Sequence, residues 1–590
     1  MSESRTELIP LLSGDPSLPP KKKETIDNFD QVLEHIGDFG AWQIILIVLL
    51  WLPPLSGGVI VLLSSFTALE PRALRCRQPC DGLYARFEDV DLYGETNSYL
   101  DFCQTPRFNG SLSWNQTTCI GSTDFDLDDL SSCQFNTSGP QNVIFQEFEF
   151  NQTIVTEWGL ICDDQYKVAL IGTAYMVGLF LGSFLSSTPA DKFGRKTMIL
   201  VLIAIGGVGD LIGGFAPEYW SYLILRILAG IGEMGMVMTT FTLSVELVGA
   251  KQQAFVGNMN QLMFAVGEIL MGVLAYFIRD WRQLHFVTAA LILPQLLLWF
   301  VIPESPRWLL AEGKTKKLPK ILNIAQKLNR KSLPPHLVFQ EEDEQNLSKK
   351  INGKHGLGFK DMFTRRSLLW RTLVMAVNWT VVSMVYYGIG MSMTVLGGNI
   401  FLNFILSAVF EILGYIVCIL ISDHWGRKPV IIVNFLACGI ACIISAFVPD
   451  SNPAKIPLVL IGKMGSSGAF STAYVYTAEL FPTPIRGTAV GFSSMIGRIG
   501  STVAPQLALF LPSLTFKELP LLIFGIAGLL GGALSFCLPE TLGHPLPDTL
   551  LEASQQGRKG SSKTLFAWWS KAKLTEEVEL QRSRNREMQL

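Results

Sequence analysis

The chain has 590 residues, of which 49% are hydrophobic and only 16% are charged. Charged residues make up about a quarter of an ordinary soluble chain, so this composition excludes a soluble globular protein. The formal net charge of −3 gives no sign of a nucleic-acid partner, because the charges are segregated into loops.

The beginning of the chain is polar and does not resemble a signal peptide. Residues 1–41 include PKKKE at Pro20–Glu24, and the first apolar run starts near Trp42. A signal peptide places a short apolar core much closer to the start. We therefore expect residues 1–41 to form a cytoplasmic N-terminal segment and residues 42–69 to form an uncleaved first transmembrane helix.

A long hydrophilic segment follows at residues 70–165. It carries five Lys or Arg against sixteen Asp or Glu, six of the ten cysteines and four Asn-x-Ser/Thr sequons. An even number of cysteines beside several sequons is typical of an oxidising, glycosylating compartment. We therefore predict an extracellular, glycosylated and disulfide-bonded loop, whose pairing the sequence leaves open. The cysteines are Cys76, Cys80, Cys103, Cys119, Cys133 and Cys162, and the sequon asparagines are Asn109, Asn115, Asn136 and Asn151.

Apolar runs long enough to cross a bilayer recur along the rest of the chain, since each crossing needs about 20 residues. Residues 166–303 are predicted to hold the second to sixth spans and residues 369–539 the seventh to twelfth. The expected fold is therefore an all-α membrane protein with twelve transmembrane helices. The spans lie near 42–68, 166–188, 197–216, 220–247, 253–278, 283–302, 369–391, 398–421, 429–449, 456–480, 487–511 and 517–538.

The segment between the sixth and seventh spans is basic. Fourteen Lys or Arg stand against six Asp or Glu between residues 312 and 371. The positive-inside rule places this segment in the cytoplasm, and an even number of spans puts both termini there too. We therefore expect a cytoplasmic central loop at residues 304–368 and a polar cytoplasmic tail at residues 540–590.

Three landmarks recur at nearly one period. DKFGRK begins at Asp191 and DHWGRK at Asp423, which is 232 residues later (423 − 191). SVELVG and TAELFP place Glu246 and Glu479 at an offset of 233 (479 − 246), and PESPRW and PETLGH begin 236 residues apart (539 − 303). This repeat predicts two six-helix halves. Transporters are commonly built in this way, with the binding site near the midplane between the halves.

The repeated charges all lie at the predicted cytoplasmic face. Ion pairs among them are candidates for a latch that closes this face and breaks when it opens. The alternative is that they only mark the cytoplasmic boundary of the membrane. The predicted gating network comprises Asp191, Arg195, Glu246, Asp423, Arg427, Glu479 and Arg486.

Taken together, these motifs resemble the major facilitator superfamily and, within it, the organic cation, anion and zwitterion transporter family. The resemblance is carried by the cysteine-rich loop, TEWGLICDDQYK, DKFGRK, AYFIRDWR, PESPRWL and VYTAELFPTPIRG, and it covers almost the whole chain. AFSTAYVYTAEL and SSMIGRIGS resemble the carnitine and zwitterion branch most. The sequence departs from the family loop at Ser187, where Gly is usual, and at Lys192, where Arg is usual.

Charges inside the predicted spans are functional candidates, because a charge at the bilayer centre costs at least roughly 2.5–3.5 kcal/mol. The resemblance implies that Glu411 in span eight balances an ammonium group and that Arg498 in span eleven binds a carboxylate. A guanidinium suits a carboxylate through two parallel hydrogen bonds. The alternative is a structural ion pair of Glu411 with Arg498 or Lys463. Asp210, Arg226, Glu233 and Glu268 are further charges. Glu233 and Glu268 are candidates for cation preference or for coupling transport to protons or sodium, and the alternative for Glu233 is a pair with Arg226.

Aromatic side chains complete the predicted substrate site, because aromatic faces attract quaternary ammonium groups. Trp379 and Tyr386 are seven residues apart on span seven, and Phe470 and Tyr474 are four apart on span ten. Gln261 matches a polar site position in the family. Ordinary helix packing is the alternative interpretation for each of these residues.

Enzyme motifs are lacking. GIGEMG at Gly230–Gly235 fits a dinucleotide-binding pattern, but it lies within an apolar span and follows no strand, so its glycines are expected to let helices approach closely. The sequence contains no phosphate-binding loop and no histidine spacing typical of a metal site. We expect no enzyme activity, no cofactor and no metal, with Na⁺ or H⁺ open as a coupling ion.

The sequence thus predicts a multi-pass plasma-membrane carrier of a small organic zwitterion or cation, which works by alternating access. An organic anion exchanger and a non-transporting, receptor-like protein are the alternatives. The lipid bilayer is the expected surrounding, no nucleic acid is expected, and the large loop is a candidate surface for forming a homo-oligomer.

Overall fold

The computed structural model describes the helical part of the chain and a few connecting residues. The described residues are 24–25, 29–70, 73–76, 143–146, 150–160, 164–331, 337–338, 361–364, 366–394, 396–449, 451–482, 485–514, 516–542, 547 and 553.

The first predicted span is a helix in three pieces, α2 (Ala41–Leu50), α3 (Leu52–Val61) and α4 (Ser64–Thr67). Prolines occupy the first turn of α3 and lack the N–H group that would continue the α2 ladder, so the break falls after Trp51. The five other helices of the first half are α7 (Tyr166–Phe193), α8 (Arg195–Gly213), α9 (Tyr219–Glu246), α10 (Ala250–Phe277) and α11 (Trp281–Ile292), which the 3-10 helix η4 (Leu293–Phe300) extends.

The second half repeats this series. Its helices are α16 (Arg366–Ser392), α17 (Ile400–Trp425), α18 (Arg427–Ala446), α19 (Lys455–Leu480), α20 (Arg486–Pro505) and α22 (Leu519–Ser535). A π-helical turn, η7 (Gln506–Phe510), and α21 (Leu511–Leu514) follow α20. All twelve predicted spans are therefore helical, and their boundaries lie within a few residues of those expected.

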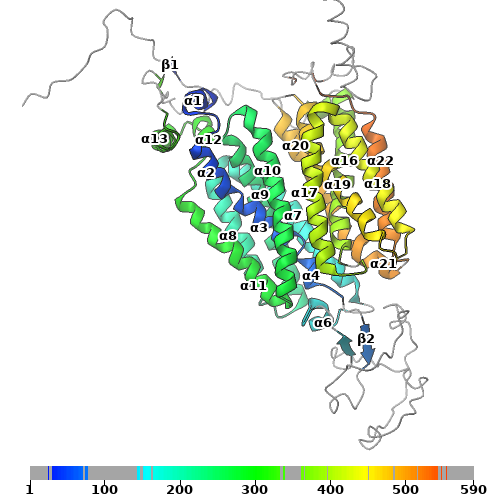
Figure 1. Ribbon diagram of the computed structural model, residues 1–590. Coiled ribbons are helices and arrows are strands. Elements are labelled where there is room, and N and C mark those ends of the chain that lie inside the picture. The colour runs from blue at the N-terminus through cyan, green and yellow to red at the C-terminus, as the bar shows by residue number, and fades with distance from the viewer. Residues whose placement is uncertain are drawn as a thin grey trace, which may run out of the picture.

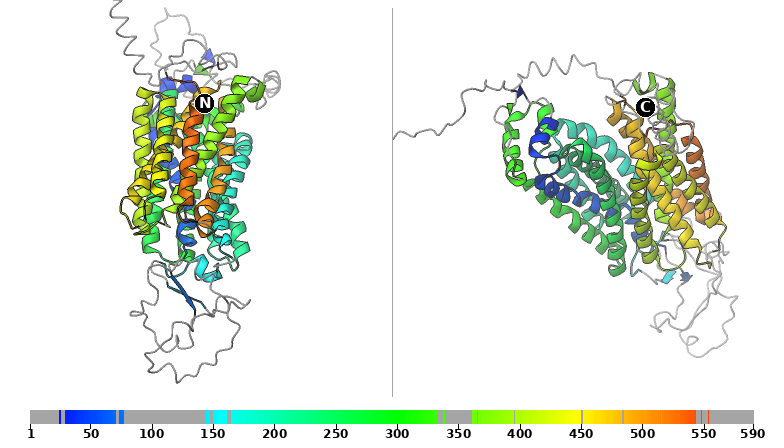
Figure 2. Two further views of the ribbon diagram at one scale, coloured as in Figure 1. Left: turned by 90° about the vertical axis from the view of Figure 1, so that its right-hand side faces the viewer. Right: turned by 45° about the horizontal axis from the view of Figure 1, so that its top comes forward.

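Helix packing within the two halves is also duplicated. In the first half, α3 packs on α10, α7 and α8 on α9, and α8 on α11. In the second half, α16 packs on α20, α17 and α18 on α19, and α18 on α22. The halves lie side by side (Figures 1 and 2) and meet where α10 packs on α17 and α7 on α20. The contact pattern thus confirms the six-helix repeat that the motifs predict.

Short elements mark the two ends of the bundle. At one end, here called the loop face, lie α6 (Ile154–Trp158) and strands β2 (Ala73–Cys76) and β3 (Val143–Gln146), which pair antiparallel. At the other end, the terminal face, lie α1 (Phe29–Ile36), α12 (Pro306–Ala311) and α13 (Leu318–Asn329) (Figure 1). The remaining elements are η5 (Thr315–Lys317), α15 (Asp361–Thr364) and the parallel pair β1 (Glu24–Thr25) and β4 (Leu337–Val338).

Nine helices in the described part of the chain are long and apolar enough to cross a membrane. The other three predicted spans are α19, α20 and α22. Of these, α22 has only 17 residues, while α19 and α20 carry buried ionic groups, Lys463 and Arg498, that lower their mean hydropathy. The bundle exterior is apolar, with Phe184, Ile224 and Leu420 each more than 60% exposed, as expected for a surface in contact with lipid.

Stacked aromatic rings join the halves at the loop face. The ring centroid of Phe66, in α4, lies 5.8 Å from that of Phe401 and 4.8 Å from that of Phe404, both in α17. Phe150 stacks on Phe66 at 6.3 Å and on Phe401 at 6.1 Å. All four rings are buried, so this aromatic stack closes the loop face of the interface between the halves.

The glycines of GIGEMG do allow close helix packing. A Cβ atom at Gly230 would meet the carbonyl oxygen of Tyr175 on α7, and one at Gly232 would meet the backbone of Gly206 on α8. Helix α9 therefore packs against both neighbours nearly backbone to backbone, which is the role of small residues in membrane helices.

Candidate functional site

A buried polar cluster lies between the two halves. Glu411 on α17 has its Oε2 atom 2.8 Å from Lys463 Nζ on α19, and its Oε1 atom accepts hydrogen bonds from the hydroxyls of Tyr386 (2.7 Å) and Tyr415 (2.9 Å). Glu268 on α10 lies 3.1 Å from the Tyr386 hydroxyl and 3.9 Å from Lys463 Nζ. The cluster therefore joins one helix of the first half to three of the second.

The ammonium group of Lys463 is held by charge and by an aromatic face. Its Nζ atom lies 3.6 Å from the centroid of the Tyr386 ring, in a cation–π contact. Its close approach to Glu411 is an ion pair by distance but does not have the angles of a hydrogen bond. The side chain is fully buried, so its N–H donors have no access to water. Lys463 therefore has bonding capacity left for another acceptor.

The predicted aromatic residues form one continuous group beside this cluster. Trp379 lies edge-on to Tyr474, with ring centroids 4.5 Å apart, and 5.7 Å from Phe470. Phe470 continues to Tyr386 at 5.4 Å. The indole N–H of Trp379 donates to Thr477 Oγ1 at 3.0 Å, which fixes the ring. The structure therefore brings all four aromatic side chains together with Glu411.

Arg498 lies in the same half but is not the partner of Glu411. Its Nη1 atom donates to the Tyr387 hydroxyl at 3.0 Å, while its buried Nε atom has no hydrogen-bond partner among the described residues. Tyr387 contacts Tyr386 edge-on at 4.9 Å, so Arg498 connects to the cluster through two adjacent tyrosines. Of the two structural alternatives for Glu411, the ion pair with Lys463 is therefore the one that forms.

Two of the charges inside the first half differ from expectation. Arg226 does not pair with Glu233; its Nη1 atom lies 3.5 Å from Asp210 Oδ1, and its guanidinium stacks 4.2 Å from the Tyr175 ring centroid. Glu233 is instead within electrostatic range of Arg498, and its Oε2 atom has no hydrogen-bond partner. The seven-residue spacing would allow Arg226 and Glu233 to pair along α9, but the Asp210 carboxylate on α8 lies closer to Arg226.

Asp210 is the centre of a second buried cluster. It accepts from His285 Nδ1 at 2.8 Å and from the Thr288 hydroxyl, and His285 Nε2 contacts the Tyr222 hydroxyl at 2.9 Å. These groups join α8, α9 and α11 within the first half alone. Asp210, His285, Thr288 and Tyr222 hydrogen-bond to one another, whereas the buried Arg226 guanidinium faces Asp210 without a hydrogen-bond partner among the described residues. All of these contacts lie within one half, so we interpret the cluster as a structural core of that half.

Gln261 lies on α10, seven residues before Glu268 and therefore on the same helical face. It is half-buried, and its Oε1 atom has no hydrogen-bond partner among the described residues. No contact joins it to the aromatic group in the described part, so its predicted role in the site stays a prediction.

The repeated loops at the terminal face fold into two copies of one corner. After α7, the Arg195 guanidinium contacts Asp191 at 2.9 Å and Glu246 at 3.2 Å. After α17, the Arg427 guanidinium contacts Asp423 at 3.0 Å and Glu479 at 3.1 Å. The arginine of each copy therefore links the ends of two helices, α7 and α9 in the first half and α17 and α19 in the second.

The third motif completes each corner. Glu304 accepts from the backbone N–H of Lys196 at 3.1 Å, and Glu540 accepts from the backbone N–H groups of Arg427 and Lys428 at 3.0 and 3.1 Å. These carboxylates cap the first turns of α8 and α18, where the free N–H groups and the helix dipole favour negative charge. Arg486 donates to the carbonyl oxygen of Ala478 at 2.8 Å. These contacts lie within single halves, so a latch between the halves stays a prediction.

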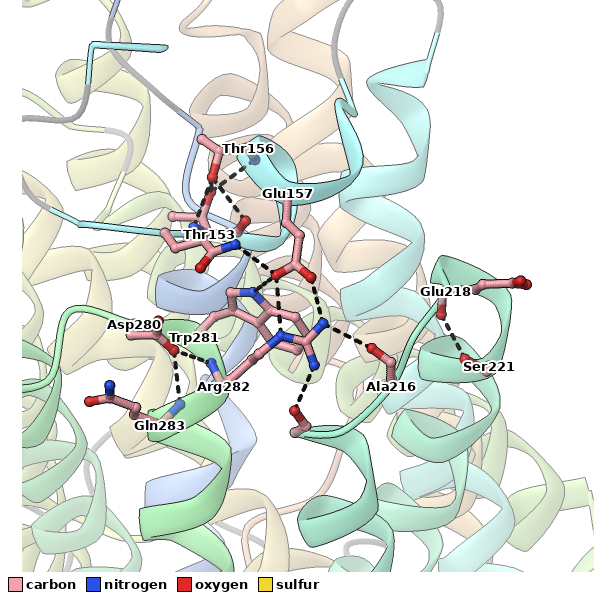
Figure 3. Close-up of polar contacts among 12 residues, drawn as sticks. Thr153, Thr156, Glu157, Ala216, Glu218, Ser221, Asp280, Trp281, Arg282 and Gln283 are labelled. Carbon is pink, nitrogen blue, oxygen red and sulfur yellow. Dashed lines mark hydrogen bonds and ion pairs between the residues drawn. The ribbon is translucent and has the colours of Figure 1, made fainter. Parts of the chain in front are cut away.

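Two sequence motifs far apart in the chain meet at the loop face (Figure 3). Glu157, from TEWGL, accepts from Arg282 Nη2 at 2.5 Å and from Trp281 Nε1 at 2.7 Å. Arg282 also donates to the carbonyl oxygens of Gly214 (2.8 Å) and Ala216 (3.1 Å). Arg282 thus ties α6 and α11 to the end of α8.

The loop predictions fall largely outside the described residues. Cys80, Cys103, Cys119, Cys133 and Cys162 lie outside them, as do Asn109, Asn115 and Asn136. Cys76 ends strand β2, and Asn151 is exposed at the loop face, a position accessible to a glycan. Glycosylation and disulfide pairing therefore stay predictions.

Sequence reasoning gave too little weight to four residues of the central cluster. Lys463 was named only as one possible partner of Glu411 and not as a site residue, yet it is fully buried beside Glu411. Glu268 was a candidate for cation preference or ion coupling but was assigned no contacts, and Tyr387 and Tyr415 were not assigned hydrogen-bonding roles. The signal for Tyr415 was its four-residue spacing from Glu411, which places both on one helical face.

Comparisons with known proteins agree with this architecture. A family model described as "Sugar (and other) transporter" matches residues 102–549. The "Organic cation transporter protein" of Drosophila melanogaster is 31% identical over 556 residues, covering 90% of this chain and 95% of that protein. The "Organic cation/carnitine transporter 2" of Homo sapiens is 30% identical over 537 residues, covering 89% and 93%. The xylose transporter XylE from E. coli, in a partially occluded inward open conformation, is similar in fold, with a TM-score of 0.54, 15% identity, and coverage of 86% and 100%.

Proposed function

Because the chain belongs to the major facilitator superfamily and, within it, to the organic cation transporter family, we propose that it carries small organic zwitterions or cations across the plasma membrane. It is a multi-pass membrane transporter rather than an enzyme. Alternating access of the central cluster, by rocking of the two halves, is the proposed mechanism.

The observation that carries the substrate proposal is the combination of charges and rings in the central cluster. Glu411 and Glu268 supply carboxylates. Trp379, Tyr386, Phe470 and Tyr474 supply aromatic faces, each with its ring centroid within 6 Å of at least one other of the four. Carboxylates and aromatic faces both attract ammonium groups. Arg498, with its unpartnered Nε atom, would take the carboxylate of a zwitterion such as carnitine.

The proposed orientation puts the loop face outside the cell and the terminal face, with both termini, in the cytoplasm. The sequons and cysteines of residues 70–165 and the basic segment at residues 312–371 support this orientation. The aromatic stack would then hold the outer side closed in the conformation described here.

The two corners at the terminal face are the proposed gating elements. Each joins helices of one half through an arginine–glutamate pair that is largely shielded from water, with Arg195 and Arg427 only 12% and 14% exposed. When the halves rock, these helix ends would move as rigid units, and closure of the cytoplasmic face would bring the two corners together. Such a latch would be weakened by neutralising Glu246 or Glu479.

The substrate proposal is tested by uptake of labelled carnitine and tetraethylammonium into cells expressing the wild type or R498A. We expect wild type to take up carnitine, and R498A to lose carnitine uptake while any tetraethylammonium uptake persists. Uptake of tetraethylammonium alone by the wild type would make Arg498 structural and the protein a cation carrier.

Organic anion exchange is the second candidate function. It is favoured by two of the buried cations, Lys463 and Arg498, which lie at or beside the central cluster and have hydrogen-bonding capacity left. Saturable uptake of a labelled dicarboxylate, with neither carnitine nor tetraethylammonium entering, would support it. A protein that transports none of these compounds would instead fit a receptor-like role. Na⁺ and H⁺ are the candidate coupling ions, and no cofactor is proposed.

A further inference from the structure

In the central cluster, the Tyr386 hydroxyl is in contact with more carboxyl groups than it has hydrogens to donate. The Tyr386 hydroxyl lies 2.7 Å from Glu411 Oε1 and 3.1 Å from Glu268 Oε1. A tyrosine hydroxyl has one hydrogen, so it donates to one carboxylate only. The second contact is a hydrogen bond only if that carboxyl group is protonated and donates to the tyrosine oxygen.

The surroundings decide which carboxyl group holds the proton. Glu411 accepts a second hydroxyl hydrogen from Tyr415 and faces Lys463 Nζ at 2.8 Å, and both contacts favour its ionised form. Glu268 lies farther from the ammonium group, at 3.9 Å, and among the described residues Tyr386 is its one hydroxyl contact. The two carboxyl groups are also within hydrogen-bonding range of each other, a contact that requires a proton on one of them. The proton therefore belongs on Glu268, which donates to Tyr386, while Tyr386 donates to Glu411.

The charge balance of the buried cluster agrees with this assignment. Lys463 and ionised Glu411 cancel, so a protonated Glu268 leaves the cluster neutral, whereas an ionised Glu268 leaves one uncompensated negative charge in the membrane interior. Helices α3 and α9 also pack on α10, the helix that carries Glu268. Helix α9 carries Glu233, and α3 has no titratable side chain. Arg498, on α20, is the cation within electrostatic range of Glu233.

Glu268 is also the only member of the cluster that comes from the first half. Tyr386, Glu411, Tyr415 and Lys463 all lie on helices of the second half. Rocking of the halves must therefore change the contacts of Glu268 with Tyr386 and Lys463, while the contacts within the second half persist. The site that holds the proton is thus the one whose surroundings depend on the transport state.

Building on the proposed cation transport, we propose that Glu268 is a proton-binding site that exchanges its proton for the substrate cation. When an organic cation enters, the Glu268 O–H bond breaks, the proton passes to water on the open side, and the carboxylate left behind pairs with the ammonium group. When the cation leaves on the other side, Glu268 takes a proton from water there. One positive charge is exchanged for one, so the exchange is electroneutral.

The test counts protons released on binding to the purified full-length protein. Tetraethylammonium is titrated by calorimetry in buffers that differ in ionisation enthalpy; because it has no proton to lose, any proton released comes from the protein. We expect release of about one proton per bound cation for the wild type and for the matched control E233Q, and none for E268Q, which has the same size but cannot ionise. Saturable binding without release by the wild type would overturn the inference and leave the transport proposal standing. Undiminished release by E268Q would assign the proton to another group.

A second measurement uses the wild type alone and does not depend on the folding of E268Q. In proteoliposomes containing a trapped pH dye, tetraethylammonium added outside should make the lumen more alkaline, because each entering cation expels a proton. Labelled tetraethylammonium entry with no change in luminal pH would overturn proton exchange. No binding and no entry of tetraethylammonium or carnitine would instead overturn the transport proposal itself.

Discussion

Lys463 Nζ lies 2.8 Å from Glu411 Oε2 in a site where both side chains are completely buried. An ammonium group of the protein itself thus already neutralises the acidic residue that the sequence marked as a cation site. A substrate cation must either displace Lys463 or use the other carboxylate, Glu268. The second course leaves the ion pair intact, which is why Glu268 is central to the proposed exchange.

We expect K463M to destabilise the protein by about 3–5 kcal/mol, because it leaves the Glu411 carboxylate buried without its cation. The double variant K463M/E411Q, which removes both charges, should recover most of this loss. Thermal unfolding of the detergent-solubilised proteins measures both. Equal destabilisation by the single and double variants would contradict the interpretation that the unpaired Glu411 carboxylate causes the loss of stability.

Y387F should impair carnitine transport selectively. It removes the hydroxyl that accepts from Arg498 Nη1 at 3.0 Å, and a hydrogen bond to a charged group is worth about 1.5–3 kcal/mol. We expect KM for carnitine to rise about tenfold or more while KM for tetraethylammonium stays within about twofold. Concentration-dependent uptake measures both constants. A similar rise for both compounds would mean that Tyr387 supports the site in general and not Arg498.

The repeated corners depend on glycine. Gly194 and Gly426 have φ angles of +99° and +101°, a region where side chains cost about 1–3 kcal/mol, and a Cβ atom at either would clash with the capping carboxylate, Glu304 or Glu540. We expect G194A and G426A each to lower the amount of folded protein. G487A is the matched control, because a Cβ atom there meets nothing within 4 Å. Size-exclusion profiles of the three variants check this, and a loss as large in G487A would refute it.

Arg282 should be essential for the loop face. R282A would remove the donor to Glu157 Oε1 and to the carbonyl oxygens of Gly214 and Ala216, at a cost of roughly 2–4 kcal/mol. K167A is the comparison, because its pair with the half-exposed Asp164 is a surface contact worth up to about 1 kcal/mol. Thermal unfolding of both variants would distinguish a structural tie from a dispensable one.

Gating predicts a difference between the two acids of each corner. Asp423 is 74% exposed and Glu479 only 19%, so the Arg427–Glu479 contact is the better shielded. E479Q should therefore lower the maximal uptake rate several-fold with KM little changed, and D423N should have a much smaller effect. Both are normalised to protein at the cell surface. Equal effects, or a change in KM alone, would argue against a latch.

The fold was predictable because its signals are local and repeated. Apolar runs gave the helices, and DKFGRK with DHWGRK gave the two halves, whose duplicated packing agrees. The partners inside the membrane were not predictable, because a buried charge takes the nearest counter-ion in space rather than along the helix. Arg226 therefore pairs with Asp210 across two helices instead of with Glu233 on its own. For Glu411 the sequence named both Arg498 and Lys463 as possible partners, and the structure shows that Lys463 is the one close to it.

The aromatic stack at the loop face has a mechanical consequence. Phe66 and Phe150 stand at the two ends of the long hydrophilic loop, and both rings stack on Phe401 of the other half. In the proposed orientation and mechanism, described residues on both sides of the loop therefore belong to the contact that would separate when the outer side opens. An antibody bound at the base of the loop would either hold this aromatic contact apart or keep it closed. It would thereby control transport without contacting the substrate.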